Sequence, residues 1–158
     1  MQKKFGVLAA VAALLVVPIV AAPNAQASDE QNLMSMEVCK RPSASGFKLH
    51  LWYNSGQGGA YRNVGYSVYD FNALRVGGDD PNAQPLKFCI IAGASGYWPG
   101  SGLRVKNNAT SGENDHYKYT AEVCFNSGYK GVRDKMAPYQ HIDRFRYVYN
   151  ENASFRRV

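Results

Sequence analysis

The segment LWYNSGQGG (residues 51–59) returns seventy-two positions later as VCFNSGYKG (residues 123–131). In both copies an apolar, aromatic run leads into Asn-Ser-Gly, and a second glycine follows three positions after the first. Glycine tolerates a positive φ and the close approach of another group, so both copies fit a tight corner between two strands. We expect structural roles for both glycines of each corner, which are Gly56 and Gly59, then Gly128 and Gly131. A phosphate-binding loop is disfavoured, because no helix-forming segment with a lysine follows either copy.

Two segments enter the corners, FKLHLWY (residues 47–53) and YKYTAEVCF (residues 117–125). In each, every second residue belongs to one mainly apolar set, which is typical of a strand with one buried face. The predicted inward residues are Phe47, Leu49, Leu51, Tyr53, Tyr117, Tyr119, Ala121, Val123 and Phe125, and the outward ones include Lys48, His50, Trp52, Glu122 and Cys124. Further predicted strands are LKFCII (residues 86–91), LRVK (residues 103–106) and FRYVY (residues 145–149), whereas VYDFNAL (residues 68–74) fits one or two helical turns. No window of helical length carries a sustained apolar stripe, so the sequence predicts an all-β protein.

A second, weaker repeat follows each corner. NNATS (residues 107–111) and NENAS (residues 150–154) both contain Asn-Ala followed by Ser or Thr. Each half thus contains a corner, a long connecting segment and then Asn-Ala-Ser/Thr. The first half is longer than the second, and its additional residues lie around 76–102. Neither half is expected to close a core alone, so we predict a sandwich of two Greek-key motifs. Both segments are also sequons that a glycosylating host would modify.

The first twenty-seven residues have the order of a secretory signal peptide. Two lysines precede an apolar run, and the small-residue pattern AQA (residues 25–27) follows it. A membrane anchor is the alternative, but Pro18 and Pro23 interrupt the run and no stop-transfer charges follow. We therefore predict a secreted, extracellular protein that begins near Ser28 and has no membrane segment after cleavage.

Removal of the leader leaves 131 residues, which is the size of one domain. The formal net charge of the whole chain is +6, and loss of the two leader lysines lowers it to +4. Arginines gather only in the last stretch, RFRYVYNENASFRRV (residues 144–158). Basic residues among aromatic ones can mark a nucleic-acid or anionic cell-wall surface. The alternation in FRYVY favours a solvated strand face instead, and we expect no nucleic-acid partner.

The chain contains three cysteines, Cys39, Cys89 and Cys124, and export permits a disulfide. An odd number leaves at least one thiol over, and spacing does not choose among the three pairings. No C-x-x-C motif supports a redox role. We expect one intrachain bridge that includes Cys39, because the segment before the first strand gains most from being tied down.

These features resemble the secreted actinobacterial peptidase inhibitors of the Streptomyces metalloproteinase inhibitor type, whose fold is βγ-crystallin-like. The resemblance is carried by the two corners, by VKNNATS and by NENASFRR, and covers about residues 47–158. It implies an N-terminal extension (residues 28–46), a first key at about 47–112 and a second at about 117–158. In crystallin-type keys an aromatic residue stands two places before the second glycine; Tyr129 meets this pattern and Gln57 does not. Members often have a cysteine where this chain has His50, which leaves Cys39 to pair with Cys89 or Cys124.

Some crystallin-type keys bind calcium through the pattern Asn/Asp, Asn/Asp, two variable residues, Ser/Thr, Ser. The weak candidates here are Asn107, Asn108, Ser111, Asn150, Glu151 and Ser154. Calcium takes six to eight oxygens, usually including carboxylates, and only Glu151 supplies one. We expect these side chains to cap turns, and we expect no cofactor.

No pattern indicates catalysis. His50, His116 and His141 have no partner at metal-ligand spacing, and no glycine-flanked nucleophile or paired carboxylates occur. His50, beside Trp52, is expected on the surface. We predict that the protein is not an enzyme, with a small secreted hydrolase as the third alternative.

The excess segment of the first half ends in GASGYWPGSG (residues 93–102), and its centre, Tyr97, Trp98 and Pro99, is the predicted inhibitory or binding loop. Two large aromatic residues beside a proline suit a preorganised anchor. The alternative is that Trp98 folds inward as a lid on the sandwich. The resemblance implies a monomeric inhibitor of metallopeptidases, with an extracellular peptidase as partner. The runner-up is a binding module of killer-toxin-like or cell-wall-binding type, with a wall polymer as partner.

Overall fold

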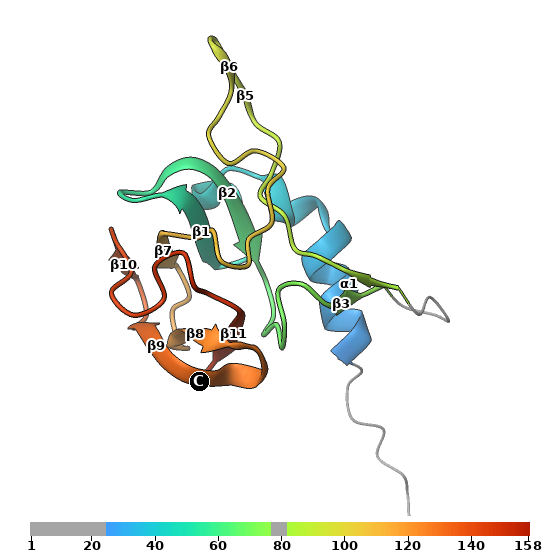
Figure 1. Cartoon of the computed structure of the whole chain (residues 1–158), viewed down its shortest axis with the longest axis vertical. Coiled ribbons are helices and arrows are strands. Elements are labelled where there is room, and N and C mark those ends of the chain that lie inside the picture. Colours follow the sequence, from blue (N-terminus) through green and yellow to red (C-terminus); the bar gives the residue numbers. More distant parts are fainter. Residues whose placement is uncertain (1–24, 77–81) are drawn as a thin grey trace, which may run out of the picture.

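The computed structural model describes residues 25–76 and 82–158 and consists mainly of two antiparallel β-sheets with a helix beside them (Figure 1). Most of the predicted signal peptide lies outside the described residues, and residues 25–27 begin helix α1 (Ala25–Met34). Within the described ranges, no helix is long and apolar enough to span a membrane.

The first sheet has four strands in the order β10-β7-β1-β2. Their bounds are Gln140–Ile142 for β10, Ser111–Asn114 for β7, Leu49–Asn54 for β1 and Gly58–Val64 for β2. The second sheet has the order β11 (Ser154–Arg157), β8 (Ala121–Asn126) and β9 (Lys130–Met136). Two small hairpins pair β3 (Leu74–Arg75) with β4 (Ala83–Gln84) and β5 (Ala92–Gly93) with β6 (Gly96–Tyr97).

The sequence repeat is also a structural repeat. β1 and β8 show the same succession of four buried residues, one half-buried residue and one exposed residue. Each pairs with the strand that follows its corner, and both pairings contain a register shift just before the corner asparagine, Asn54 or Asn126. The first corner glycines, Gly56 and Gly128, have φ values of +70° and +73°, which favour glycine over residues with a side chain.

A serine from each Asn-Ala-Ser/Thr segment closes the corner of its own key. The Ser111 hydroxyl donates to the Asn54 carbonyl at 2.8 Å and accepts the Gln57 N–H at 3.2 Å. The Ser154 hydroxyl donates to the Asn126 carbonyl at 2.7 Å and accepts the Tyr129 N–H at 3.1 Å. The two repeats seen in the sequence are therefore parts of one structural unit that occurs twice.

The two keys exchange strands. β10 belongs to the second half of the chain but pairs with β7 in the first sheet. Val68 belongs to the first half but forms an antiparallel bridge with Phe155 of the second sheet, through backbone hydrogen bonds of 2.7 and 3.0 Å. The predicted fold class, a βγ-crystallin-like sandwich of two Greek-key motifs, is confirmed.

One hydrophobic core fills the space between the sheets. Leu49, Leu51 and Val64 of the first sheet belong to the same buried cluster as Val123, Met136 and Phe155 of the second. The connecting segments add further large side chains, namely Phe71, Leu74, Leu86, Phe88, Val105, Phe145 and Val148. The core is thus built from both keys together, as the exchanged strands require.

The N-terminal extension contains α1 and two short 3-10 helices, η1 (Met36–Cys39) and η2 (Pro42–Ala44). α1 carries no apolar stripe, and Asn32 is its one fully buried residue among those whose burial the structure describes. Asn32 Oδ1 accepts the N–H groups of Gly65 and Tyr66 at 2.8 and 3.0 Å. Arg62 donates to the carbonyls of Asn32 and Leu33 at 2.5 and 2.9 Å, where the helix dipole favours a cation. Polar contacts therefore dock the helix.

The disulfide joins Cys39 of η1 to Cys89, which confirms a bridge that includes Cys39. The ring it closes attaches the N-terminal extension to the segment before β5. Cys124 is a buried free thiol on β8, and burial raises its pKa. A thiol of that kind is structural rather than reactive.

The prediction that the outward face of residues 47–53 meets solvent is wrong. His50 is 0% exposed and Trp52 is 5% exposed, because the N-terminal extension covers this face. The His50 ring is hydrogen-bonded through Nδ1 to Asn63 Oδ1 at 2.8 Å, and Asn63 in turn donates to the carbonyls of Glu37 and Lys40. Both sides of β1 are therefore buried.

The predicted strands at residues 117–120 and 145–149 are also wrong. β8 begins only at Ala121, and Tyr117, expected inward, is 72% exposed. Residues 146–148 form bends because the Asp134 carboxylate accepts the N–H groups of Arg146, Tyr147 and Val148 at 2.8–3.2 Å. Phe145 is buried in the core, whereas the two tyrosine rings lie under arginines, with the Arg144 guanidinium 4.3 Å from the Tyr149 ring and that of Arg146 5.1 Å from the Tyr147 ring.

Three further segments form less regular structure than predicted. Residues 86–91 and 103–106 meet only in a single bridge between Lys87 and Arg104, although Leu86, Phe88 and Val105 are buried. The Leu86 N–H donates to the Phe71 carbonyl, and a few backbone hydrogen bonds, such as Phe88 N–H to the Leu103 carbonyl, join the two segments. These bonds do not form a continuous ladder. Residues 68–74 form a bridge and a turn in place of the expected helical turns.

Candidate functional site

The predicted contact segment projects from the body of the protein as a β-hairpin (Figure 1). We call residues 90–101 the projecting hairpin. Ala92 pairs with Tyr97 and Gly93 with Gly96, so the chain reverses over the two residues between them. Every residue from 92 to 99 is exposed. The hairpin is therefore accessible to a macromolecular partner.

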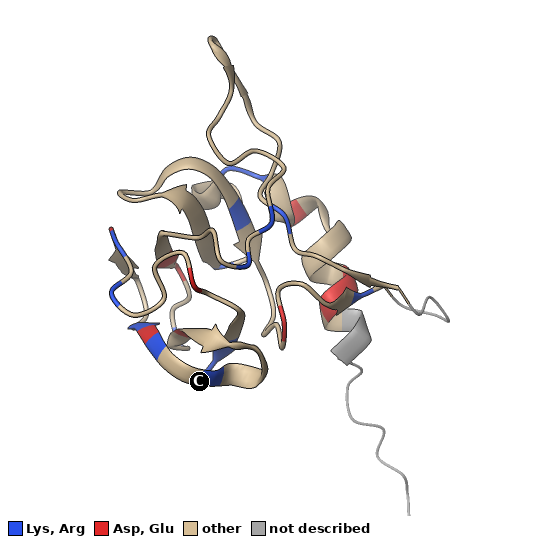
Figure 2. Ribbon diagram, viewed as in Figure 1, with Lys and Arg blue, Asp and Glu red and all other residues tan. Residues whose placement is uncertain are grey.

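The projecting hairpin is uncharged and carries large apolar side chains. No Lys, Arg, Asp or Glu lies between residues 90 and 101, and Figure 2 shows its tip without charge colouring. Ile90 and Tyr97 are each 72% exposed, and Trp98 is 43% exposed. Depletion of charge together with exposed aromatic residues is typical of the centre of a protein–protein interface.

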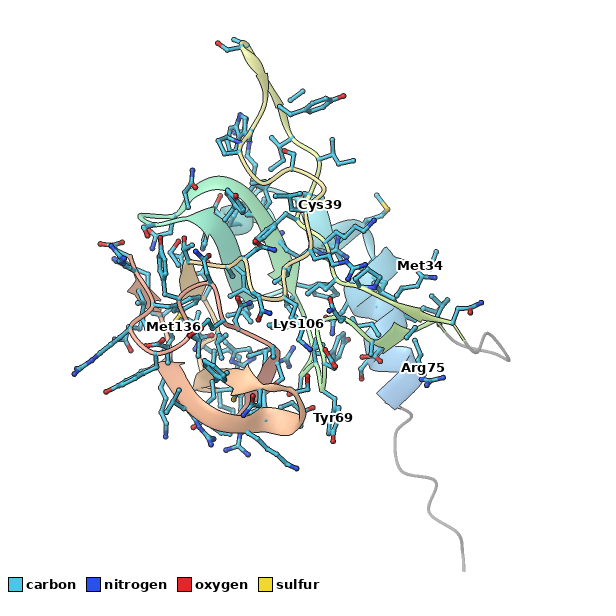
Figure 3. The ribbon with its side chains drawn as sticks, in the orientation of Figure 1. Met34, Cys39, Tyr69, Arg75, Lys106 and Met136 are labelled. Carbon is cyan, nitrogen blue, oxygen red and sulfur yellow. A yellow bond between two sulfur atoms is a disulfide. The ribbon has the colours of Figure 1, made fainter. Side chains whose placement is uncertain are left out.

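Backbone hydrogen bonds and the disulfide fix the base of the hairpin. The Ala60 N–H on β2 donates to the Pro99 carbonyl, and the Trp98 N–H donates to the Ile91 carbonyl, both at 2.8 Å. Cys89, which directly precedes the hairpin, is bonded to Cys39, labelled in Figure 3 near the hairpin base. A loop held in one orientation loses less entropy when it binds a partner.

Two glycines allow the hairpin to lie close to the first corner. A Cβ on Gly59 would lie 2.8 Å from the Pro99 carbonyl oxygen, and a Cβ on Gly100 would lie 2.2 Å from the Tyr53 ring. The first corner therefore positions the hairpin in addition to reversing the chain. At the second corner, a Cβ on Gly131 would meet only the side chains of Asn126 and Phe125, at 3.0 and 3.2 Å.

Trp98 lies across the hairpin and outside the hydrophobic core. Its Nε1 is so close to Gly93 that a Cβ there would be 2.8 Å away. Trp98 also lines a groove of about 640 Å³ between the hairpin and the first sheet, together with Trp52 and Tyr61. The alternative prediction, that Trp98 folds inward as a lid on the sandwich, does not agree with this partly exposed position.

The weak calcium candidates are engaged in the fold. Ser111 and Ser154 close the corners, and the Asn108 amide caps the carbonyls of Arg104 and Lys106. Asn107, Asn150 and Glu151 border a hollow that also contains Lys106. The Lys106 ammonium group donates to Asp70 and Ser127 at 2.9 and 3.1 Å. An ammonium group beside a single exposed carboxylate does not fit Ca²⁺. The sequon asparagine of the second copy, Asn152, is fully buried and cannot carry a glycan in the folded protein.

The three histidines have different surroundings, although His50 and His141 flank Glu113 in the first sheet. His50 is buried, and its Nε2 lies 3.5 Å from Asp115 Oδ2. His116 Nδ1 accepts the N–H groups of Lys118 and Tyr119, and His141 Nε2 lies 3.8 Å from Asp143. Within the described ranges, no group of three or more His, Cys, Asp or Glu residues could hold a metal ion.

The structure contains a second candidate site that the sequence did not reveal. A groove of about 660 Å³, which we call the aromatic groove, is lined by Gly46, Phe47, Lys48, Gly65, Tyr66, Asp115, His116, Tyr117, Tyr139 and Arg157. Five separate segments contribute to it, so no local motif marks it. Its one sequence signal, the tyrosine-rich stretch from residue 117, was interpreted as a strand.

No protein-family model and no curated protein matches this chain. A solved structure described as "Evolution of the eye lens beta-gamma-crystallin domain fold" is similar over 71% of this chain and 85% of its own, with 13% identity and a TM-score of 0.45. A likeness at this level carries nothing about function. The fold assignment rests on the strand order and on the two serine-closed corners.

Proposed function

We propose that this protein is a secreted peptidase inhibitor, directed at metallopeptidases, that inserts the projecting hairpin into the cleft of the enzyme. The observation that carries the proposal is the exposed and uncharged hairpin, anchored at its base by a disulfide and by β2. Tyr97, Trp98 and Pro99 are the residues that we assign to contact with the enzyme.

The hairpin has the properties that binding in a peptidase cleft requires. Peptidases bind extended segments through strand-like backbone hydrogen bonds, and one or two side chains fill pockets. β5 and β6 pair only with one another among the described strands, so their outer edges are free for such bonds. Pro99 restricts φ next to Trp98, which favours a single bound shape.

Two further observations support a role outside the cell. The disulfide between Cys39 and Cys89 is of the kind that persists in oxidising compartments. The corner and Asn-Ala-Ser/Thr segments resemble those of secreted inhibitors of metallopeptidases.

The direct test is to incubate the purified protein with a thermolysin-like metallopeptidase and, separately, with a subtilisin. Inhibition of the metallopeptidase is expected. Trp98→Ala and Tyr97→Ala should each weaken inhibition at least about tenfold, as expected for hot-spot residues. The thermal melt should change little for Tyr97→Ala, because this ring is 72% exposed. Trp98→Ala should lose no more than about 2 kcal/mol, less than a fully buried core tryptophan would, because Trp98 is 43% exposed.

Tyr117→Ala is the matched control, because Tyr117 and Tyr97 are both 72% exposed and Tyr117 lies in the aromatic groove. This variant should inhibit like the wild type. A wild-type protein that inhibits neither peptidase would rule out the proposed function. Equal inhibition by all three variants would show that another surface makes the contact.

A further inference from the structure

We propose that the aromatic groove binds a saccharide that carries a carboxylate group. This would give the protein a second ligand site, for an acidic polysaccharide, in addition to the hairpin. The proposal does not rest on peptidase inhibition, because different residues form the two sites.

The aromatic groove and the hairpin contact lie at opposite ends of β1 and β2. The hairpin docks at the corner end, through Gly59 and Ala60. The groove begins beyond the opposite end, where Leu49 pairs with Val64 and the chain continues into Lys48 and Gly65. The six residues of β1 span about 20 Å at the usual rise per residue, so both sites can be occupied at once.

Aromatic rings provide the apolar surface of the groove. Tyr117 and Tyr139 are 72% and 71% exposed, and Tyr66 is 40% exposed. The Phe47 ring forms the floor and lies so close to Gly65 that a Cβ there would be 2.4 Å from it. Exposed rings with a polar tip suit the faces of sugar rings, whose C–H groups are apolar and whose edges carry hydroxyls.

Arg157 provides an anion-binding group that the protein itself does not neutralise. Its guanidinium carbon lies 5.3 Å from the centre of the Tyr66 ring, and no carboxylate of the described residues lies within 4.0 Å of it. Burial lowers the pKa of this guanidinium. A partly desolvated guanidinium is stabilised by an anion, and its planar fork fits a carboxylate through two hydrogen bonds.

The other polar groups select a sugar over a chain of phosphates. The Asp115 carboxylate lies in the same groove and disfavours the closely spaced charges of a phosphate chain, but it accepts hydrogen bonds from the hydroxyl groups of a sugar. His116 Nδ1 accepts two backbone N–H groups, so the neutral ring carries its proton on Nε2, where it can donate. Lys48 also lines the groove, and its ammonium group donates to the Ser45 carbonyl at 2.8 Å. Two cations without a carboxylate partner among the described residues, one carboxylate acceptor and several rings match a ligand with many hydroxyls and one carboxylate per unit.

The test is a calorimetric titration of the full chain with a short oligomer of galacturonic acid and with the neutral galactose oligomer of equal length. The acidic oligomer should bind with a Kd of about 1 mM or tighter, and the neutral one at least about tenfold more weakly. Arg157→Gln keeps most of the stem on Tyr66 but removes the charge, and should weaken binding of the acidic oligomer at least about tenfold.

Arg156→Gln is the matched control, because the adjacent Arg156 pairs with Glu122 at 2.7 Å and does not line the groove. It should bind the acidic oligomer as the wild type does, and so should Trp98→Ala in the hairpin. Equal affinity for the two oligomers, no measurable binding, or an equal loss in Arg156→Gln and Arg157→Gln would overturn the proposal. Loss of inhibition in Trp98→Ala with unchanged saccharide binding would separate the two functions.

Discussion

The two keys share one backbone but cover the outer faces of their sheets in different ways. His50 in the first key is equivalent to Glu122 in the second, and each faces a partner on the next strand, Asn63 or Lys135. Asn63 is bonded to the N-terminal extension, which buries His50 and Trp52. Glu122 is instead surrounded by cations that face solvent.

In the second key, charged side chains around Glu122 cover the outer face of the sheet, where the first key uses the N-terminal extension. We call these residues the Glu122 cluster. The carboxylate is only 4% exposed and accepts from Arg133, Lys135 and Arg156 at 2.9, 2.9 and 2.7 Å. Their side chains remain 27%, 63% and 37% exposed, so they close the face and still reach water. Equivalent positions also differ in sign: Arg62 holds α1, whereas Asp134 holds the bends at 146–148. The corners thus define the backbone, and the outward side chains depend on what each copy must cover.

The largest effect is expected from valine at the second corner glycine of each key. Gly59 and Gly131 have φ values of +71° and +80°, so Gly59→Val and Gly131→Val should each destabilise the fold by about 3 kcal/mol. Gly59→Val should lose about 1 kcal/mol more, because its Cβ meets the Pro99 backbone whereas Gly131 meets movable side chains. Chemical denaturation measures both losses.

Gly58→Val is the control for the glycine variants. Gly58 does not have a positive φ, and a Cβ there would be no closer than 3.4 Å to any neighbour. This variant should change the free energy of unfolding by less than about 1 kcal/mol. A loss under about half a kcal/mol in Gly131→Val would show that the corners are not closed to side chains.

The parts of the fold that sequence predicted are those determined by local backbone chemistry. A positive φ at Gly56 and Gly128 and a serine that closes each corner are constraints within one segment or one repeat. The errors arise where a distant polar group decides the structure. Asp134 bends residues 146–148, and Asn32 docks a helix that has no apolar stripe. The projecting hairpin could be located as an uncharged insertion, but the aromatic groove depends on five segments that only the fold brings together.

A smaller effect is expected when the Glu122 cluster loses its charge. Glu122→Gln leaves three cations around a neutral group and should destabilise the protein by about 2 kcal/mol at pH 7. Burial alone would raise the pKa of Glu122, but the hydrogen bonds from Lys135, Arg133 and Arg156 lower it from 4.5 to about 2. The stability that the wild-type carboxylate contributes is therefore present above about pH 4.5 and lost as the pH falls towards 2.

Measuring the free energy of unfolding at several acidic pH values tests whether Glu122 stabilises the fold through its charge or only through packing. The difference between wild type and Glu122→Gln should shrink as the pH falls from 4.5 to 2, because both then lack the charge. Glu151→Gln, which removes an exposed carboxyl group, should follow the wild type throughout. A difference that stays constant down to pH 2 would mean that packing, and not charge, explains the loss.

The smallest effect is the pH dependence of the first key, which depends on His50. Asn63 Nδ2 donates to two carbonyls, so Asn63 Oδ1 must accept, and His50 Nδ1 carries the proton of the 2.8 Å bond. Burial lowers the pKa of His50 below its ordinary value of 6.5, and the bond to Asn63 and the charge of Asp115 offset only part of this. His50 is therefore protonated at a higher pH in the unfolded chain than in the folded protein. The free energy of unfolding should decrease as the pH drops below about 6.5.

His50→Asn keeps a donor towards Asn63 but cannot be protonated. It should be less stable than the wild type at pH 7, because the smaller side chain leaves space in a fully buried position. Its loss of stability between pH 7 and pH 5 should nevertheless be smaller than that of the wild type, by up to about 1 kcal/mol. His141→Asn, on an exposed side chain, should keep the wild-type slope. A steeper acid slope in His50→Asn than in the wild type would reverse the sign of this argument and place the pH sensitivity of the first key elsewhere.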